Sequence, residues 1–277
     1  MTRVAVLGLV AAAVLSCTAA RADGGVPGFG HVVVITFENK EQDQVVGSSS
    51  APTFTAMARR YAQLTNYEAV AHPSLPNYLA LISGSTHGIH SDCTSCGIDG
   101  RNLADTLGSA GRSWKAYAEG LPRAGWTGAF AGLYAKKHMP FLYFRDVAMS
   151  PARRGRVVPV TQLATDLAAD AVPDFALVVP NLCNSMHDCP VATGDRWLAR
   201  MLPPLLALPE TVVFVVFDEG AGGNHVPALA LGTAVRTGSR ATARTGHYGL
   251  LRTIETAWGL PLLGRSASAR PITGIWR

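Results

Sequence analysis

Acidic and amide side chains follow three apolar runs of this sequence, at the points where buried strands would end. Glu38 and Asn39 follow the first run, Asn181 follows the second, and Asp218 and Glu219 follow the third. Adjacent carboxylates at the end of a buried strand repel each other and lose hydration unless a positive group binds them. Such oxygen donors suit Mg²⁺, Mn²⁺ or Ca²⁺, and a nearby histidine would extend the choice to zinc or iron. The plainer alternative is that Asp218 caps a loop and Glu219 faces solvent.

A candidate nucleophile, Ser74, lies in the segment His72-Pro-Ser-Leu-Pro-Asn-Tyr78, just before a predicted helix. Pro76 suits the first turn of that helix, where free N–H groups and the helix dipole favour a phosphate group. A serine hydroxyl needs a base or a metal to become a good nucleophile. Since the sequence has no G-x-S-x-G elbow, activation by the acidic cluster fits better than a hydrolase triad. The alternative is that Ser74 is only the N-cap of the helix.

Two histidines could act beside this serine. His187 lies in Cys183-Asn-Ser-Met-His-Asp-Cys189, and His247 lies at the start of another predicted helix. Either could hold a phosphate oxygen, protonate a leaving alkoxide or bind a metal ion. Taken singly, each is more readily explained as a structural histidine, so their function depends on the cluster around them.

These residues need a scaffold that brings distant segments together. Strands buried on both faces are indicated by continuous apolar, β-branched runs at residues 31–37, 174–179, 211–217 and 226–231. Helical patterns lie between them, at about residues 53–64, 77–83, 102–109, 161–170, 193–206 and 245–258. The alternation predicts an α/β fold with a mostly parallel sheet and helices on both faces. Ligands of such sheets bind beyond the carboxyl ends of the strands, where the polar clusters would converge.

The bulk properties fit one globular enzyme-like domain. The chain has 277 residues, of which 48% are apolar and 16% charged, so it is neither disordered nor fibrous. The net charge of +5 favours anionic substrates but is too small to indicate nucleic-acid binding. We expect residues 23–277 to form a single domain. The irregular segment 111–159 is a possible cap insertion, whose His138 and Tyr143 either line the pocket or pack in the core.

The first 22 residues have the pattern of a secretory signal peptide. An apolar run from Val4 to Leu15 precedes the small-residue cleavage pattern Ala20-Arg-Ala22. The run is too short to span a bilayer comfortably, and no later segment is long and apolar enough, so we expect no transmembrane segment. We therefore expect a secreted or extracytoplasmic protein. The alternative is a lipoprotein anchored through Cys17.

Four cysteines follow the predicted signal peptide, and an even number in an exported chain suggests two disulfides. Of the three possible connectivities, the simplest pairs Cys93 with Cys96 and Cys183 with Cys189. A zinc site built on Cys93-x-x-Cys96 is less favoured, because the second pair has a different spacing and the expected compartment is oxidising.

Taken together, these segments resemble the bacterial phosphoesterase family that includes acid phosphatases and phosphatidylcholine-type phospholipases C, within the alkaline-phosphatase-like superfamily. The resemblance is carried, in order along the chain, by Thr36-Phe-Glu-Asn39, His72–Tyr78, Pro180–Asp188, Asp218–His225 and His247–Glu255. It implies an alkaline-phosphatase-like, three-layer sandwich. No single segment would make it specific, but five in this order do.

The resemblance also implies roles for the candidate metal ligands. Glu38, Asp218 and Glu219 are similar to the metal-binding acids of the family, with Ser74 as a further ligand and the nucleophile. Two-metal relatives often carry an aspartate where this chain has Asn181, and a neutral amide is a poorer ligand. We therefore expect one divalent metal ion of unknown identity rather than two.

The remaining roles concern the phosphate group. Asn39 and Asn77 are similar to residues that bind phosphate oxygens, and His187 and His247 to residues on the phosphate or leaving-group side. We expect an exported, metal-dependent phosphoesterase that hydrolyses phosphate monoesters through a phosphoserine intermediate, as acid phosphatases do. Its substrate would be a phosphorylated small molecule or lipid headgroup, and no obligate protein partner is evident.

Three alternatives remain open at this point. The first is a phosphodiesterase or phospholipase C acting on phospholipid headgroups, although the sequence shows no obvious lipid-binding module. The second is a non-catalytic exported protein that binds metal or phosphate, and the third is a glycan-modifying transferase of the same superfamily. Hydrolysis of monoester, diester and phospholipid substrates would separate them.

Overall fold

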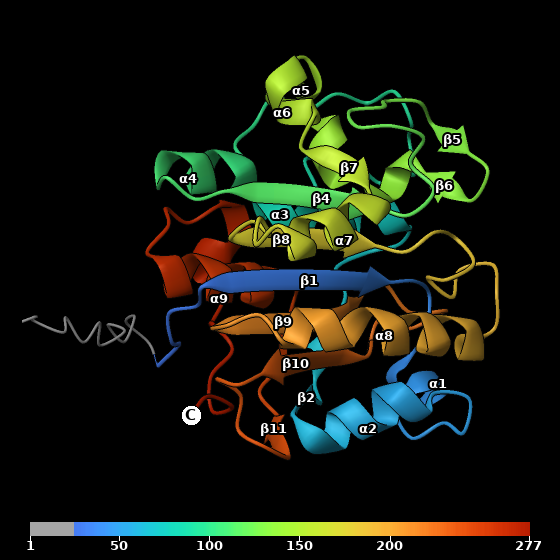
Figure 1. Cartoon of the computed structure of the whole chain (residues 1–277), viewed down its shortest axis with the longest axis vertical. Coiled ribbons are helices and arrows are strands. Elements are labelled where there is room, and N and C mark those ends of the chain that lie inside the picture. Colours follow the sequence, from blue (N-terminus) through green and yellow to red (C-terminus); the bar gives the residue numbers. More distant parts are fainter. Residues whose placement is uncertain (1–24) are drawn as a thin grey trace, which may run out of the picture.

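The computed structural model describes residues 25–277, so the predicted signal peptide and Cys17 lie outside the described residues. Its main sheet has eight strands: β1 (His31–Phe37), β2 (Ala62–Leu64), β4 (Trp114–Ala118), β7 (Val157–Pro159), β8 (Phe175–Val179), β9 (Thr211–Phe217), β10 (Ala228–Gly232) and β11 (Ser239–Ala241). Their order across the sheet is β11-β2-β10-β9-β1-β8-β4-β7. Only β10 runs antiparallel to its neighbours, β9 and β2 (Figure 1). The sheet is therefore mostly parallel, as the sequence predicts.

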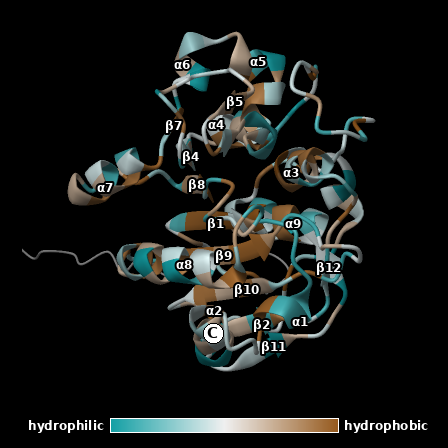
Figure 2. Ribbon diagram, turned by 90° about the vertical axis from the view of Figure 1, so that its right-hand side faces the viewer, coloured by the Kyte–Doolittle hydropathy of each residue, from teal (hydrophilic) through white to brown (hydrophobic). Residues whose placement is uncertain are grey.

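Helices cover both faces of this sheet. The longer ones are α2 (Pro52–Arg60), α3 (Ser74–Ser83), α4 (Leu103–Ser109), α7 (Thr161–Ala168), α8 (Val191–Leu206) and α9 (His247–Trp258). Figure 2 views the sheet edge-on, with α7 and α8 on one side and α3 and α9 on the other. The result is the three-layer α/β arrangement that the sequence predicts.

Short elements complete the chain. The short helices are α1 (Gln42–Val45), α5 (Arg145–Ala148), α6 (Pro151–Arg154), η1 (Lys136–His138), η2 (Pro140–Tyr143) and η3 (Gly264–Ser268). Two small two-stranded ladders pair β3 (Tyr67–Glu68) with β12 (Thr245–Gly246) and β5 (Phe130–Ala131) with β6 (Tyr134–Ala135).

The central strands are buried on both faces, which explains their unbroken apolar sequences. Every residue of β8 and β9 is buried, and so is every residue of β1 after His31. The same strands are coloured hydrophobic in Figure 2. Burial of this apolar surface contributes roughly 25 cal/mol per Å², and it holds the ends of β1 and β9 rigidly side by side.

Two predicted helices have other bounds in the structure, and one predicted strand has a direction that the sequence pattern does not specify. The helix expected at 53–64 stops at Arg60, because Ala62 and Gln63 pair with β10 and become strand β2. The helix expected at 77–83 begins three residues earlier, at Ser74. The run at 226–231 forms β10, but it runs antiparallel to β9. At the end of α2, strand pairing therefore overrides the local helical pattern.

The segment 111–159 contributes strands at both of its ends. β4 pairs with β8, and β7 pairs with β4 at the edge of the main sheet. Between these strands lie the β5–β6 ladder, η1, η2 and two short helices. The cap assignment stays a prediction, but η1 packs on α3 and so brings part of the segment to that helix.

Both expected disulfides are present, joining Cys93 to Cys96 and Cys183 to Cys189. The first disulfide closes a short loop after α3, and the second closes a short loop after β8. Within residues 25–277, no helix is both long and apolar enough to cross a membrane.

Candidate active site

The site is built where β1 and β9 end. The register pairs Phe37 with Phe217, so Glu38 and Asp218 leave the sheet next to each other. The Asp218 N–H donates to the Phe37 carbonyl over 2.9 Å, which extends the pairing by one step. Two acids from distant segments of the chain are thereby forced together at one sheet edge, at the tip of the β1 arrow in Figure 1.

Ser74 points into this acidic cluster. Ser74 is the first residue of α3, and its side chain is only 1% exposed. The N-cap residue of this helix is Pro73. Its Oγ lies 3.2 Å from Glu38 Oε2 and 3.2 Å from Glu219 Oε1. Ser74 is therefore not the N-cap of the helix; its hydroxyl links two carboxylates beside a helix N-terminus.

Burial and mutual repulsion dominate the electrostatics of the cluster. Glu38 and Asp218 are almost completely buried. Burial, and then the Asp218 charge, raise the pKa of Glu38 well above its ordinary value. Burial and the Glu219 charge raise the pKa of Asp218 to about 7, and burial also raises the pKa of Glu219. Three carboxylates in one place thus favour a bound cation.

The donor set fits a hard divalent cation. Asp218 Oδ1 accepts hydrogen bonds from the N–H groups of Glu219 (2.7 Å) and Asn39 (3.3 Å), whereas its Oδ2 is buried without a partner among the described residues. Carboxylate and hydroxyl oxygens are what such ions bind. Within residues 25–277, no group of three or more His, Cys, Asp or Glu side chains is arranged so that it could hold a metal ion. Instead the Ser74 hydroxyl bridges Glu38 and Glu219.

His247 forms a hydrogen bond to the backbone of Asp218. Its Nε2 lies 2.7 Å from the Asp218 carbonyl oxygen and its Nδ1 lies 3.0 Å from the Tyr67 hydroxyl. A carbonyl only accepts, so Nε2 carries the proton and Nδ1 accepts from Tyr67. Burial lowers the pKa of His247 to about 4, which keeps the ring neutral. Both ring nitrogens are engaged, so in this structure His247 fixes the end of β9.

The side chains of Asn39 and Asn77 differ in whether their amide oxygen has a hydrogen-bond partner. The Asn39 Oδ1 is buried and has no hydrogen-bond partner within the described part of the chain. The side chain of Asn77, in contrast, accepts from the N–H groups of Val70 and Ala71 and donates to the carbonyls of Ala71 and Pro73. Asn77 therefore shapes the loop that leads into Ser74, and its role as a phosphate binder stays a prediction.

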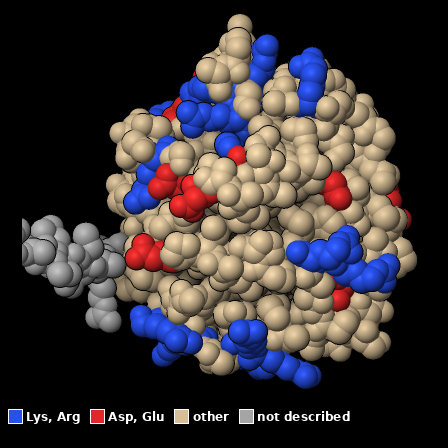
Figure 3. Space-filling view, viewed as in Figure 1, with Lys and Arg blue, Asp and Glu red and all other residues tan. Residues whose placement is uncertain are grey.

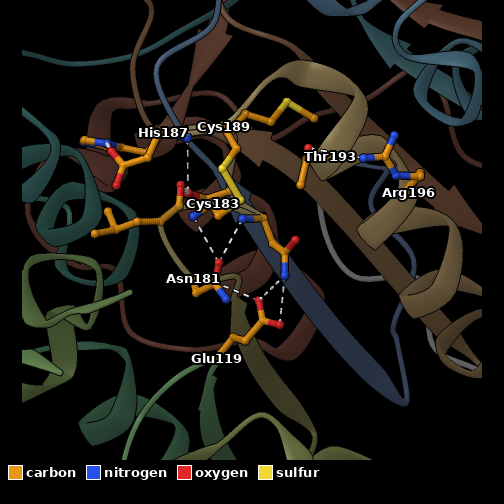
Figure 4. Close-up of a disulfide and its surroundings, with 12 residues drawn as sticks. Glu119, Asn181, Cys183, His187, Cys189, Thr193 and Arg196 are labelled. Atoms are coloured by element: carbon orange, nitrogen blue, oxygen red, sulfur yellow. Dashed lines mark hydrogen bonds and ion pairs between the residues drawn. A yellow bond between two sulfur atoms is a disulfide. The ribbon is translucent and has the colours of Figure 1, made fainter. Parts of the chain in front are cut away.

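The loop that carries His187 is held by its own side chains and by Glu119, which follows β4 (Figure 4). Asn181 Oδ1 accepts from the N–H groups of Cys183 and Asn184, and Glu119 accepts from Asn181 N and Asn184 Nδ2. The Asn181 oxygen thus already accepts two hydrogen bonds, and the expectation of one metal ion rather than two stays a prediction. His187 Nδ1 lies 2.6 Å from Asp188 Oδ1.

Lys137 contacts one residue beside the first disulfide and one residue within the loop of the second. Its Nζ lies 2.8 Å from Asp92 Oδ2 and 3.4 Å from His187 Nε2. Asp92 in turn accepts the N–H of Leu75, the residue after Ser74, over 3.0 Å. Burial lowers the pKa of Lys137, but the hydrogen bond and charge of Asp92 outweigh this effect and the net pKa is raised. A charged lysine therefore lies beside the first turn of α3.

Three residues beside the acidic cluster, His72, Tyr78 and Lys137, escape the sequence analysis, whereas His138 is named there as a possible pocket residue. Tyr78 donates to Glu38, His72 Nδ1 lies 2.5 Å from Glu219 Oε2, and His138 Nε2 lies 3.3 Å from Glu38 Oε2. His72 and Tyr78 belong to the motif that contains Ser74, so their polar character was a usable signal. Lys137 and His138 come from the irregular segment 111–159, where no periodicity indicates which side chains point inward. Tyr143 is buried, and burial raises its pKa.

Comparisons with known proteins give one consistent result. The model of the Phosphoesterase family matches residues 48–261, a range that includes Ser74, Asp218 and Glu219 but begins after Glu38. A Mycobacterium tuberculosis protein named phosphatidylinositol-3-phosphatase is 35% identical over 98% of this chain and 93% of its own length. A probable acid phosphatase of Kluyveromyces lactis is 30% identical over 86% of this chain, which spans 60% of that relative.

Solved structures show the same fold at low sequence identity. A Vibrio parahaemolyticus protein of the alkaline phosphatase superfamily superposes with a TM-score of 0.60, 15% identity, and coverage of 91% of this chain and 72% of that one. This likeness concerns the architecture alone.

Proposed function

The chain belongs to the Phosphoesterase family of hydrolases that act on phosphoric ester bonds, and we propose that it is an exported, metal-dependent phosphomonoesterase with Ser74 as nucleophile. One observation carries the proposal. The buried Ser74 hydroxyl lies 3.2 Å from two carboxylates and at the N-terminus of α3, where backbone N–H groups favour a phosphate.

The reaction has two chemical steps. Ser74 Oγ forms a bond to phosphorus as its proton passes to a carboxylate, and the P–O bond to the alcohol breaks. The leaving alkoxide takes the proton of His187 Nε2, while Asp188 holds the other ring nitrogen, Nδ1. This transfer requires that Lys137 leaves Nε2 for the phosphate. Water then attacks phosphorus as its proton passes to His187, and the P–O bond to Ser74 breaks. The serine oxygen takes the proton back from the carboxylate, which restores the hydroxyl as orthophosphate leaves.

Glu38, Asp218, Glu219 and Ser74 would hold one divalent cation. When bound, it supplies Lewis-acid assistance that lowers the pKa of the serine hydroxyl and offsets the clustered negative charge. The protein's own contribution is to fix these oxygens rigidly. His247 anchors the Asp218 backbone, and Tyr78 donates to Glu38.

Lys137 provides the positive charge for the phosphate oxygens. It is held by Asp92 beside the Leu75 N–H, so a phosphate arriving at Ser74 meets an ammonium group and a helix N-terminus together. The Asp92 carboxylate accepts from both donors in the free protein. We propose that the substrate phosphate replaces Asp92 at one or both of them.

Export is supported by the two disulfides, which persist in oxidising compartments. The proposed signal peptide, residues 1–22, would direct it.

Hydrolysis of p-nitrophenyl phosphate by the mature protein, before and after chelation, tests the function. We expect chelation to abolish turnover and one added divalent ion to restore it. Bis-p-nitrophenyl phosphate and phosphatidylcholine are assayed in parallel, and a preference for either diester would replace the monoesterase proposal by a phosphodiesterase or phospholipase C. Turnover that survives complete chelation would contradict the metal requirement.

A further inference from the structure

A cavity of about 420 Å³ lies between β3, β12, the first turn of α9 and the segment around η3. Its volume is in the range of sites for small molecules. Three arginines line it (Arg244, Arg265 and Arg270), against a single carboxylate, Glu68. The lining therefore carries an excess of positive charge, and an anion is the ligand that this charge favours.

Two of the three arginines are available for a ligand. Arg244 pairs with Glu68. Arg265 lies over the Tyr248 ring, with Cζ 5.6 Å from the ring centroid, and it forms no ion pair with any carboxylate of residues 25–277. Arg270 also forms no ion pair with any carboxylate of residues 25–277. A guanidinium that is stacked on an aromatic ring keeps its edge N–H donors for an anion.

The first turn of α9 adds neutral donors to the same cavity. Within the described chain, no side chain caps this helix, and the cavity is lined by Tyr248 and Gly249 in its first turn. Thr245 also lines it, and its Oγ1 is buried without a hydrogen-bond partner in the described structure. A Cβ at position 249 would lie 2.1 Å from this Oγ1 and 3.2 Å from the Arg270 carbonyl oxygen, so a larger residue here would displace part of the cavity wall.

The cavity shares its walls with the candidate active site. His247 lines it and also binds the Asp218 carbonyl through Nε2 at 2.7 Å. Val70 lines it and donates its N–H to Asn77, three residues after Ser74. None of the carboxylates around Ser74 belongs to its lining. The cavity is thus a neighbour of the reaction centre and not a part of it.

We propose that this arginine cavity binds a second anionic group on the alcohol portion of the substrate, while the phosphate to be hydrolysed lies at Ser74. The inference rests on the proposed function and specifies its substrate class: phosphomonoesters whose alcohol carries a further phosphate or phosphodiester. The second anion could belong to a soluble bisphosphate or to a lipid headgroup, since both present the same chemistry to the arginines.

The test compares substrates that differ only in the second anion. Linear alkanediol bisphosphates, from propane to octane, are assayed beside the corresponding hydroxyalkyl monophosphates, so that chain length also measures the span between the two sites. In the double variant Arg265→Ala/Arg270→Ala, we expect KM for the preferred bisphosphate to rise at least about tenfold, because charge-assisted hydrogen bonds are lost. The monophosphates and p-nitrophenyl phosphate should change less than about twofold, as they do not reach the arginines.

The matched control removes two arginines elsewhere. Arg59, on α2, and Arg240, on β11, line another cavity, of about 380 Å³. Figure 3 shows that lysine and arginine side chains also gather along the lower edge of the molecule. Arg59→Ala/Arg240→Ala lowers the net charge equally, so an equal loss with bisphosphates would show general electrostatic attraction and overturn the proposal. Equal KM changes for mono- and bisphosphates in the first variant would overturn it too.

Two further measurements complete the test, one with a lipid substrate and one of binding alone. Monomeric short-chain phosphatidylinositol 3-phosphate replaces the alkanediol compounds, and a KM effect confined to it would assign the cavity to a lipid headgroup. Calorimetric binding of the bisphosphates to Ser74→Ala protein, with and without the arginine changes, does not depend on turnover. It therefore decides the proposal even if the phosphomonoesterase assignment fails, and unchanged affinity would refute the cavity's role.

Discussion

Two regions of this molecule bury carboxylates at the sheet, and they treat them in opposite ways. Asp166, on α7, receives hydrogen bonds from Lys115 (2.5 Å), Tyr117 (2.6 Å) and Gln162 (3.0 Å). Burial alone would raise its pKa, but these partners lower it below the ordinary value. Glu38, Asp218 and Glu219 instead lie together with all three pKa values raised.

The difference separates a carboxylate that stabilises the fold from carboxylates that wait for a ligand. A paired and fully hydrogen-bonded acid has little left to offer a substrate or metal. A buried cluster of like charges is unfavourable by itself, and proteins keep such clusters where a cation or a reaction compensates them. Substitutions in the two regions should therefore have effects of opposite sign on stability, and only those in the acidic cluster should lower activity.

The largest effect is expected at Ser74, the hydroxyl that joins the acidic cluster. Ser74→Ala should lower kcat for p-nitrophenyl phosphate at least about a thousandfold, as loss of a nucleophile generally does. The fold should be intact, since the serine makes hydrogen bonds only to acids that repel each other. Turnover is measured alongside thermal unfolding, and wild-type-like hydrolysis would exclude Ser74 as the nucleophile.

Exchanging one acid in each region tests the comparison directly. In chelated protein, Asp218→Asn should raise the free energy of unfolding by about 1–2 kcal/mol because it relieves buried repulsion, and activity with metal should fall about a hundredfold or more. Asp166→Asn should lower the free energy of unfolding by about 1–3 kcal/mol, because Lys115 loses its partner, and leave kcat nearly unchanged. Denaturant titration and the phosphatase assay give the two readouts. Destabilisation by both variants would mean that the acidic cluster is structural like Asp166.

The adjacent residues Lys136 and Lys137 allow the same comparison for positively charged side chains. Lys137 lies between Asp92 and His187, whereas Lys136 donates to the Thr94 carbonyl over 3.0 Å and lies over the Tyr143 ring. Lys137→Met should lower kcat/KM about 10–100-fold through loss of a charged contact to phosphate, and Lys136→Met should leave it within about threefold. Inhibition by orthophosphate, weakened only by Lys137→Met, provides the independent check. Equal losses in both variants would assign Lys137 a packing role.

The sequence reveals the acidic cluster more clearly than its surroundings. Glu38, Asp218 and Ser74 follow or precede strongly patterned segments, so the tendency of ligands to bind at strand ends is enough to predict that they converge. Lys137, His138 and Asp92 come from loops without periodicity, and their positions depend on how η1 packs against α3. The hydrogen bonds of Asn77 and His247 were equally hidden, because a residue type does not specify its hydrogen-bond partner.

The last expected effect concerns the pH dependence of stability and involves Glu255, a buried acid that is intermediate between the two regions. It accepts from Ser266 Oγ (2.6 Å) and Leu263 N (2.9 Å) but has no cation at hydrogen-bond distance among the described residues, and burial raises its pKa to about 7. A carboxyl whose pKa is higher in the folded state binds more protons there, so the free energy of unfolding falls as the pH rises from about 4.5 to about 7. Glu255→Gln should remove roughly 1–3 kcal/mol of this decline, at about 1.36 kcal/mol per pKa unit. Denaturant unfolding at several pH values in this window measures it. An unchanged slope in the variant would mean that two neutral donors suffice to keep a buried carboxylate charged, and the cation at Asp166 would then not be the decisive difference.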